Sequence, residues 1–193
     1  MNRKAEYKSA IRSRKMIRHA FVELVLEKDI EKITIRNIVE KAEISRGTFY
    51  AHYSDIYAVF EEIENEIMGE IAVILNEFKS ADIIQNPRPC LEKMALFFNQ
   101  DIEFYRKSIN TKYTPNYVKN IKELLVVKIL SYEETHSSIQ KSKEFTLRVH
   151  FYVGGLISLF QEWLEGTFEC TLNELTATIT KFMVQGLQSN TLK

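Results

Sequence analysis

Apolar side chains recur at steps of three and four residues over long stretches of this 193-residue chain. The clearest run comprises Ile56, Phe60, Ile63, Ile67, Ile71, Ile74 and Phe78. This spacing forms one apolar stripe along an α-helix and does not fit the two-residue period of a strand. With six glycines and three prolines in all, the chain also has few turn residues for a barrel or a sandwich. We therefore predict an all-α fold.

Two short helices are predicted near the N-terminus. Thr34 can cap a helix that runs to about residue 41, and Ser45 can cap another that runs to about residue 52. A longer helix is expected before them at residues 8–28. Ser54 and Asp55 can cap the long helix from Ile56 that follows them. Two helices of about eight residues, joined by a short turn and braced by longer helices, form a helix-turn-helix unit.

The rest of the chain is predicted to form a helical body. Further helices are expected at 89–108, 116–134, 141–165 and 171–188, after a break at Asn86-Pro87-Arg88-Pro89. We therefore expect an N-terminal arm and helix-turn-helix domain at residues 1–60, and a second domain at residues 61–193.

The net charge of zero conceals an uneven distribution of charge. Residues 1–60 carry 12 basic and 8 acidic side chains, whereas residues 61–193 carry 14 and 18. Within residues 1–20 there are seven basic side chains and one acid, Glu6. This segregation favours a polyanionic partner at the N-terminal end, although a solvated basic tail would give the same pattern.

The sequence does not favour an enzyme or a metal protein. It has no Gly-rich phosphate loop, no nucleophile beside a base and no distinctive pair of carboxylates. Carboxylates and thiols at metal-binding spacing are missing around all four histidines, which are His19, His52, His136 and His150. We expect no metal and no cofactor, and a helical enzyme with a scattered site is kept as an alternative.

The sequence also lacks the marks of a membrane or secreted protein. No window reaches the run of about 18 uncharged apolar residues that a membrane span needs. The polar, basic N-terminus does not resemble a secretory signal, and Cys90 and Cys170 have no repeated spacing. Two lone thiols suit a reducing compartment, so we expect a cytoplasmic protein.

The predicted helix at 45–52 is unusual for a purely structural helix. It contains Gly47, which costs a helix interior about 1 kcal/mol relative to alanine, so a compensating reason is expected. Close approach to the floor of a DNA groove is one such reason. Arg46 can donate two hydrogen bonds to guanine, and hydroxyl groups can reach phosphates. Phe49 and Tyr53 are expected to pack inward.

These residues resemble the DNA-binding domain of the tetracycline-repressor (TetR) family of regulators. The match lies within residues 10–60 and rests on Glu27-Lys28-Asp29, Ile33-Thr34-Ile35-Arg36-Asn37-Ile38, Ser45-Arg46-Gly47-Thr48-Phe49-Tyr50 and His52-Tyr53. The resemblance implies a sequence-specific transcriptional regulator that acts as a homodimer on a palindromic operator in double-stranded DNA, with repression as the expected direction. The third helix of each subunit would then enter the major groove, and the two grooves would lie about 34–36 Å apart along the DNA.

The resemblance also implies roles for individual residues. DNA contacts are expected from Thr34, Arg36, Ser45, Arg46, Gly47, Thr48, Tyr50 and His52. Of these, Arg46 and Gly47 would meet base edges, and Ser45 could serve only as a helix cap. Two positions depart from the family pattern. Glu43 stands where the turn usually has glycine, so a different turn geometry is expected, and Ile56 replaces a lysine that usually contacts a phosphate.

The C-terminal part is loosely similar to a subgroup related to the dihydroxyacetone-operon activators. The implied dimer interface comprises Gly154, Gly155, Trp163, Leu172, Leu175, Ile179, Phe182 and Gly186. The same apolar stripe would also serve a core within one chain. A small apolar or aromatic effector is expected among Phe97, Phe98, Phe104, Tyr105, Tyr117, Phe151 and Tyr152, although ordinary packing is the better explanation for any one of them alone. An adaptor that binds a protein partner instead of DNA is the other alternative, and Ile56 favours it.

Overall fold

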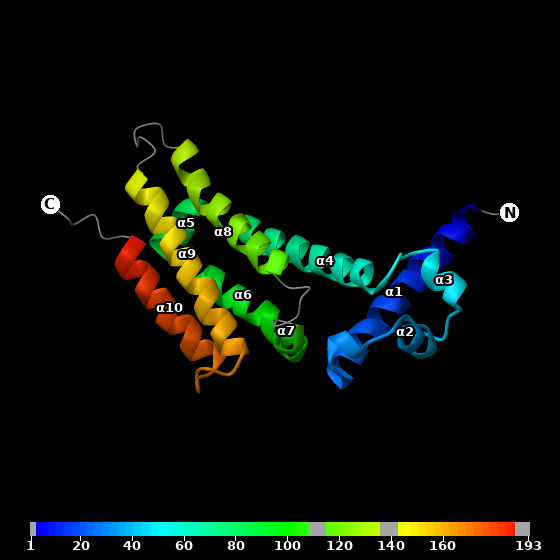
Figure 1. Cartoon of the computed structure of the whole chain (residues 1–193). Helices are drawn as coiled ribbons and strands as arrows, with labels where there is room; N and C mark the ends of the chain where they lie inside the picture. Colours follow the sequence, from blue (N-terminus) through cyan, green and yellow to red (C-terminus); the bar gives the residue numbers. More distant parts are fainter. Residues whose placement is uncertain (1–2, 109–114, 136–142, 188–193) are drawn as a thin grey trace. The chain divides into compact units, whose positions relative to one another are not determined.

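The computed structural model describes residues 3–108, 115–135 and 143–187 (Figure 1). Every regular element within these ranges is helical, which confirms the predicted all-α fold. By its contacts the chain divides into two compact units. Unit 1 comprises Met1–Ile67 and Glu103–Thr114, and unit 2 comprises Met68–Ile102 and Pro115–Lys193.

Unit 1 is built around the two short helices predicted near the N-terminus. Its elements are α1 (Arg3–Glu27), the 3₁₀ helix η1 (Ile30–Lys32), α2 (Ile35–Lys41), α3 (Arg46–Tyr50), the first part of α4 (Ile56–Asn76) and α7 (Ile102–Ser108). Phe21 of α1, Ile38 of α2, Phe49 of α3 and Val59 of α4 are fully buried. Burial of apolar side chains from four helices stabilises this unit and fixes the orientation of α3.

Local capping residues set where the short helices begin. The Thr34 hydroxyl accepts a hydrogen bond from the Asn37 amide while the Asn37 side chain accepts one from the Thr34 amide, a reciprocal capping box. Ser45 accepts from the Thr48 amide at 3.0 Å, and Asp55 accepts from the Ala58 amide at 2.9 Å. The predicted caps at Thr34, Ser45 and Asp55 are confirmed.

Unit 2 is a helical body. It contains the rest of α4, α5 (Ser80–Gln85), α6 (Arg88–Gln100), α8 (Pro115–Thr135), α9 (Lys143–Leu164) and α10 (Leu172–Leu187). Helix α9 packs against α8 and α10, and α10 also packs against α6 (Figure 1). Val149 and Val153 of α9 are fully buried, and the rings of Phe98 and Phe160 lie 5.0 Å apart between centroids.

Two helix assignments made from the sequence are wrong. The helix expected at 89–108 is divided at Asp101, whose φ of −125° and ψ of 34° leave the helical region, so α6 and α7 are separate. The apolar pattern runs through this break and therefore does not reveal it. The sequence also did not indicate α5, where the Ser80 hydroxyl donates to the Lys128 carbonyl of α8 at 2.8 Å. A tertiary contact of this kind has no local sequence signal.

Membrane spans, metal clusters and the cysteines can also be compared with the structure. None of the helices in the described ranges is long and apolar enough to cross a membrane. Those ranges also contain no cluster of three or more side chains that could hold a metal ion. Burial raises the pKa of the Cys90 thiol to about 11, an effect that Lys128 partly offsets, so this thiol stays protonated at neutral pH.

Candidate nucleic-acid interface

The turn between α2 and α3 has a left-handed residue. Glu43 has a φ of +53°, the only positive φ of a non-glycine residue in the described part of the chain. The Ile44 amide donates to the Val39 carbonyl at 3.0 Å and the Glu43 amide to the Glu40 carbonyl at 3.3 Å, as in a Schellman motif. The turn therefore keeps the conformation that suits glycine, and the expected change of geometry at Glu43 is wrong.

Helix α3 buries its apolar side chains and exposes its polar ones. Phe49 is fully buried and Tyr53 is 4% exposed, so the expectation that both pack inward is confirmed. Arg46, Gly47 and Tyr50 are exposed on the same short helix. A Cβ added at Gly47 would meet only the Ser45 hydroxyl, at an ordinary contact distance of 3.6 Å. The fold of this chain therefore does not itself require glycine at position 47.

Most other residues expected at the interface already have partners within unit 1. Thr34 is engaged in its capping box, and the Ser45 and Thr48 hydroxyls lie 2.9 Å apart. Arg36 forms an ion pair with Glu40 at 2.7 Å. His52 Nε2 lies 2.7 Å from the Ser13 hydroxyl of α1. All of these contacts are at least partly exposed, whereas Arg46 has no ion pair or hydrogen bond within the described residues.

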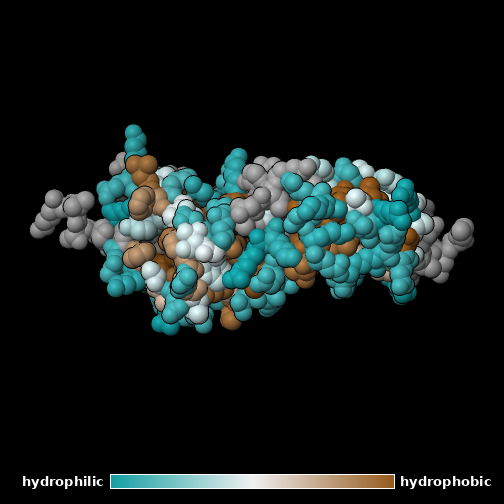
Figure 2. Space-filling view, turned by 60° about the horizontal axis from the view of Figure 1, so that its bottom comes forward, coloured by the Kyte–Doolittle hydropathy of each residue, from teal (hydrophilic) through white to brown (hydrophobic). Residues whose placement is uncertain are grey.

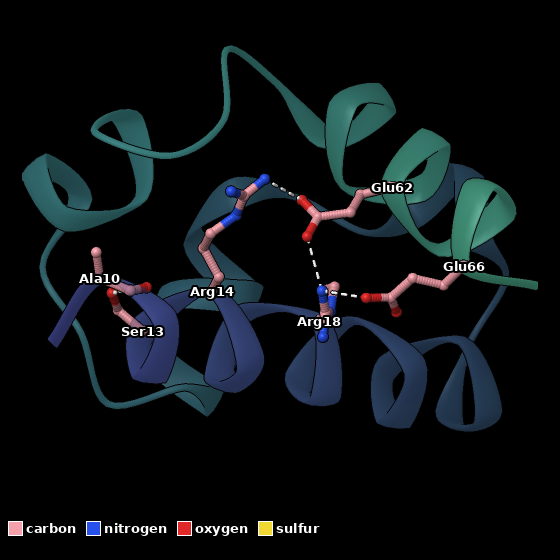
Figure 3. Close-up of polar contacts among 6 residues, drawn as sticks. All are labelled: Ala10, Ser13, Arg14, Arg18, Glu62 and Glu66. Carbon is pink, nitrogen blue, oxygen red and sulfur yellow. Dashed lines mark hydrogen bonds and ion pairs between the residues drawn. The ribbon is translucent and has the colours of Figure 1, made fainter. Parts of the chain in front are cut away.

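An ion-pair cluster joins α1 to α4 and was not predicted (Figure 3). Glu62 accepts from Arg14 and from Arg18, each at 2.7 Å, and Arg18 also pairs with Glu66. We call these four residues the α1–α4 ion-pair cluster. Both arginines and both glutamates are spaced four residues apart, so each pair shares a helical face. That matched spacing in the sequence is the signal that could have indicated the cluster.

The cluster surrounds the end of the helix-turn-helix. The Arg14 guanidinium lies 5.7 Å from the centroid of the Tyr53 ring. Burial, and then Glu62, raise the pKa of the Tyr53 hydroxyl to about 12. Burial alone would raise the pKa of Glu62, but Tyr53 and the two guanidinium groups outweigh it, so that pKa is lowered. Ile56 is the first residue of α4, six residues before Glu62, and it is half-buried.

A separate apolar groove lies between α9 and α10 in unit 2. It has a volume of about 450 Å³ and is lined by Phe151, Tyr152, Gly155, Leu156, Leu159, Ile179, Phe182, Met183 and Gln185. Phe151 is 73% exposed and Phe182 is 51% exposed, and a Cβ added at Gly155 would meet nothing within 4 Å. In Figure 2, white and brown atoms interrupt the hydrophilic surface of unit 2. Three residues expected at a dimer interface, Gly155, Ile179 and Phe182, line this groove.

The other residues expected at a dimer interface lie elsewhere. Trp163 is 6% exposed, and its indole Nε1 donates to the Cys170 carbonyl at 2.7 Å. A Cβ on Gly154 would lie 3.5 Å from Lys122 Nζ of α8. Trp163 therefore takes part in packing within one chain, whereas Gly154 is half-buried beside the flexible end of the Lys122 side chain. Leu172 is half-buried and Leu175 is buried. Gly186 lies in α10, but its surroundings are outside the described residues.

The aromatic residues expected around an effector are distributed over both units. Phe104 and Tyr105 are buried residues of unit 1. Within unit 2, Phe98 and Tyr117 are buried and Phe97 is half-buried. Phe151 and Tyr152 instead line the open groove between α9 and α10. The structure therefore assigns these last two to the groove surface, because α9 turns them away from its buried face at Val149 and Val153.

Comparison with known families accounts for most of the chain. Residues 17–63 match the family model described as bacterial regulatory proteins, tetR family. Residues 85–185 match the model TetR_C_8, described as a transcriptional regulator C-terminal region. The second match alone spans just over half of the chain.

One curated relative matches part of the chain. It is the uncharacterized HTH-type transcriptional regulator YxbF of Bacillus subtilis, 25% identical over 108 residues. The match covers 54% of this chain and 28% of YxbF, so the two proteins share only a portion of their lengths.

Several solved structures share the fold. The dihydroxyacetone kinase operon activator DhaS has a TM-score of 0.66 at 17% identity, covering 91% of this chain and 96% of that one. A TetR transcriptional regulator from Streptococcus agalactiae has a TM-score of 0.68 at 16% identity, covering 94% and 99%. Thermus thermophilus FadR, a repressor solved with lauroyl-CoA, has a TM-score of 0.64 at 14% identity, covering 93% and 97%.

Proposed function

Because this chain belongs to the TetR family of transcriptional regulators, we propose that it binds an operator in double-stranded DNA through α3. The observation that carries the proposal is the composition of the exposed side of α3. Arg46 has no partner within the described residues, and beside it stands a glycine that the fold does not require. A cation with free donors next to a position without a side chain suits close approach to base edges.

The groove between α9 and α10 supports a homodimer in which two copies of this face meet. Large apolar residues such as Phe151 and Phe182 gain free energy when they leave water. A two-fold dimer buries the same patch on both subunits, and it presents two copies of α3 to a palindromic operator. Repression by this dimer is our proposal for the direction of regulation.

An apolar or aromatic small molecule is proposed as the effector. The aromatic residues of unit 2, among them Phe98, Phe160 and Tyr117, supply the chemistry for an apolar site. FadR, which shares the fold, was solved with an acyl-CoA. Such a molecule releases DNA only if it binds the DNA-free arrangement more tightly than the DNA-bound one.

Arg46→Ala tests whether α3 reads bases. We expect the operator affinity to fall by about 1–3 kcal/mol and discrimination to relax at one base pair in each half-site. Tyr50→Phe should instead weaken operator and non-specific DNA alike, because phosphates carry no sequence information. Fluorescence anisotropy with operator variants measures both. Equal loss on operator and non-specific DNA for Arg46→Ala would contradict base reading, and a wild-type protein without any DNA affinity would favour a protein-binding adaptor.

Gly47→Ala is expected to change stability and DNA affinity in opposite directions. Alanine fits the free space at position 47 and favours the helix, so the free energy of unfolding should rise by about 0.5 kcal/mol. The added methyl group should hold α3 away from the groove floor and lower the operator affinity about tenfold, or about 1.4 kcal/mol. Urea unfolding and anisotropy measure the two effects.

Gly69→Ala is the matched control. Gly69 is an exposed glycine of α4 with nothing within 4 Å of an added Cβ. This variant should gain stability and keep its DNA affinity. An undiminished operator affinity in Gly47→Ala would show that α3 does not approach DNA closely at this position.

A further inference from the structure

The cations of α1 fall into two groups. Of the five lysines and arginines whose side chains are described, Arg14 and Arg18 are held by the α1–α4 ion-pair cluster. The other three, Lys8, Arg12 and Lys15, are exposed and have no ion pair or hydrogen bond within the described residues. Their charges are therefore available to a partner, whereas those of Arg14 and Arg18 are largely neutralised.

The three unpaired cations share one face of α1. Their spacing of four and then three residues aligns them along the helix axis, and we call them the α1 cation stripe. The stripe is about 10 Å long, which equals the rise of about three nucleotides of one DNA strand. Like charges at this spacing repel and destabilise the helix slightly. A polyanion that binds the stripe would remove that repulsion.

A hydrogen bond places this part of α1 beside the helix-turn-helix. His52, just after α3, lies 2.7 Å from the hydroxyl of Ser13, and Arg12 is the neighbour of Ser13 in the chain. Figure 1 likewise shows the N-terminal turns of α1 next to α3. The stripe therefore lies on the same N-terminal turns of α1 that contact His52, on the side of the helix that faces solvent.

We propose that the α1 cation stripe is a second phosphate-binding surface, which grips the DNA backbone beside the groove that α3 enters. This inference rests on the proposed DNA binding. It explains how this chain could bind DNA with Ile56 at the position where the TetR resemblance implies a phosphate-binding lysine. The stripe would supply the missing cations from another helix. Contacts of this kind add affinity for any sequence and orient α3, but they do not select bases.

The test compares two triple variants with the same change of net charge. Lys8→Gln, Arg12→Gln and Lys15→Gln remove the stripe. Each phosphate contact contributes about −0.9 to the slope of log K against log salt. Three contacts in each subunit of a dimer therefore predict a slope that is shallower by about five, on operator and on non-specific DNA alike. Fluorescence anisotropy at several salt concentrations measures the slope.

The control variant carries Lys79→Gln, Lys143→Gln and Lys181→Gln. These are exposed lysines of unit 2 without an ion pair or hydrogen bond within the described residues. The control should change the slope by less than the contribution of one phosphate contact. A stripe variant that keeps the wild-type slope, or matches the control, would overturn the stripe while operator binding stands. Wild-type protein that does not bind DNA would overturn the proposed function itself.

Discussion

Replacing Phe151 with glutamate is expected to leave each protomer folded and to convert the proposed dimer into monomers. Phe151 is 73% exposed in one chain, so little of the protomer's packing depends on it. In a dimer built on the α9–α10 groove, the new carboxylate would be buried against the partner without a counter-ion. We expect the dimer to weaken by about 3 kcal/mol or more, at least 100-fold. Sedimentation at micromolar concentration measures this change.

Operator binding should be lost in the same variant, because one subunit contacts only one half-site. Leu96→Glu is the matched control, since Leu96 of α6 is also exposed, by 69%, and does not line the groove. Ile179 is a poorer site for such a test, because it is 6% exposed and a charge there would disturb the protomer itself. If Phe151→Glu still sedimented as a dimer, the α9–α10 face would not be the interface.

Glu62→Ala is expected to destabilise unit 1 by about 1–2 kcal/mol. The substitution removes the shared partner of Arg14 and Arg18, and the Arg18 side chain is only 20% exposed. Arg18 keeps Glu66 as a partner and the Arg14 side chain is 49% exposed, so the loss should lie between that of an exposed ion pair and that of a buried one. Urea unfolding followed by circular dichroism measures the free energy of unfolding.

The effect of Glu62→Ala should depend on pH. The pKa of Glu62 is lowered in the folded protein, so the unfolded chain binds more protons than the folded one as the pH falls. The stabilisation by Glu62 is thus complete above the ordinary pKa of glutamate and is lost as the pH falls through the lowered value. The difference between variant and wild type should therefore shrink below about pH 4. Glu70→Ala, on the exposed side of the same helix, should stay within about 0.5 kcal/mol of wild type at every pH.

The features that could be predicted from sequence are those with local causes. Thr34, Ser45 and Asp55 cap helices because their own side chains reach amides three residues later. The inward orientation of Phe49 and Tyr53 follows from helical periodicity over a short, well-defined helix. The candidate DNA-contact residues follow instead from the resemblance of residues 10–60 to the TetR family, and their roles stay predictions.

The features that could not be predicted depend on which helix packs against which. Arg14 and Arg18 find their partners in a helix more than 40 residues later, and their pairing separates them from Lys8, Arg12 and Lys15. Helical periodicity alone does not show which apolar residues of α9 are buried. It does not distinguish Trp163, which is buried and donates to the Cys170 carbonyl, from Phe151, which is exposed. That distinction is made by α8 and α10, which cover one side of α9 and leave the other open.

Helix α7 makes unit 1 discontinuous in the chain. Glu103–Thr114 belongs to this unit by its contacts, although residues 68–102 before it belong to unit 2, and the Lys107 ammonium donates to the Leu26 carbonyl at the end of α1. Any fragment that stops before residue 103 therefore lacks part of the unit. Recombination between two regulators of this kind therefore cannot exchange unit 1 as one uninterrupted gene segment. A functional chimera needs two crossovers, so that α7 travels with the helix-turn-helix to which it belongs.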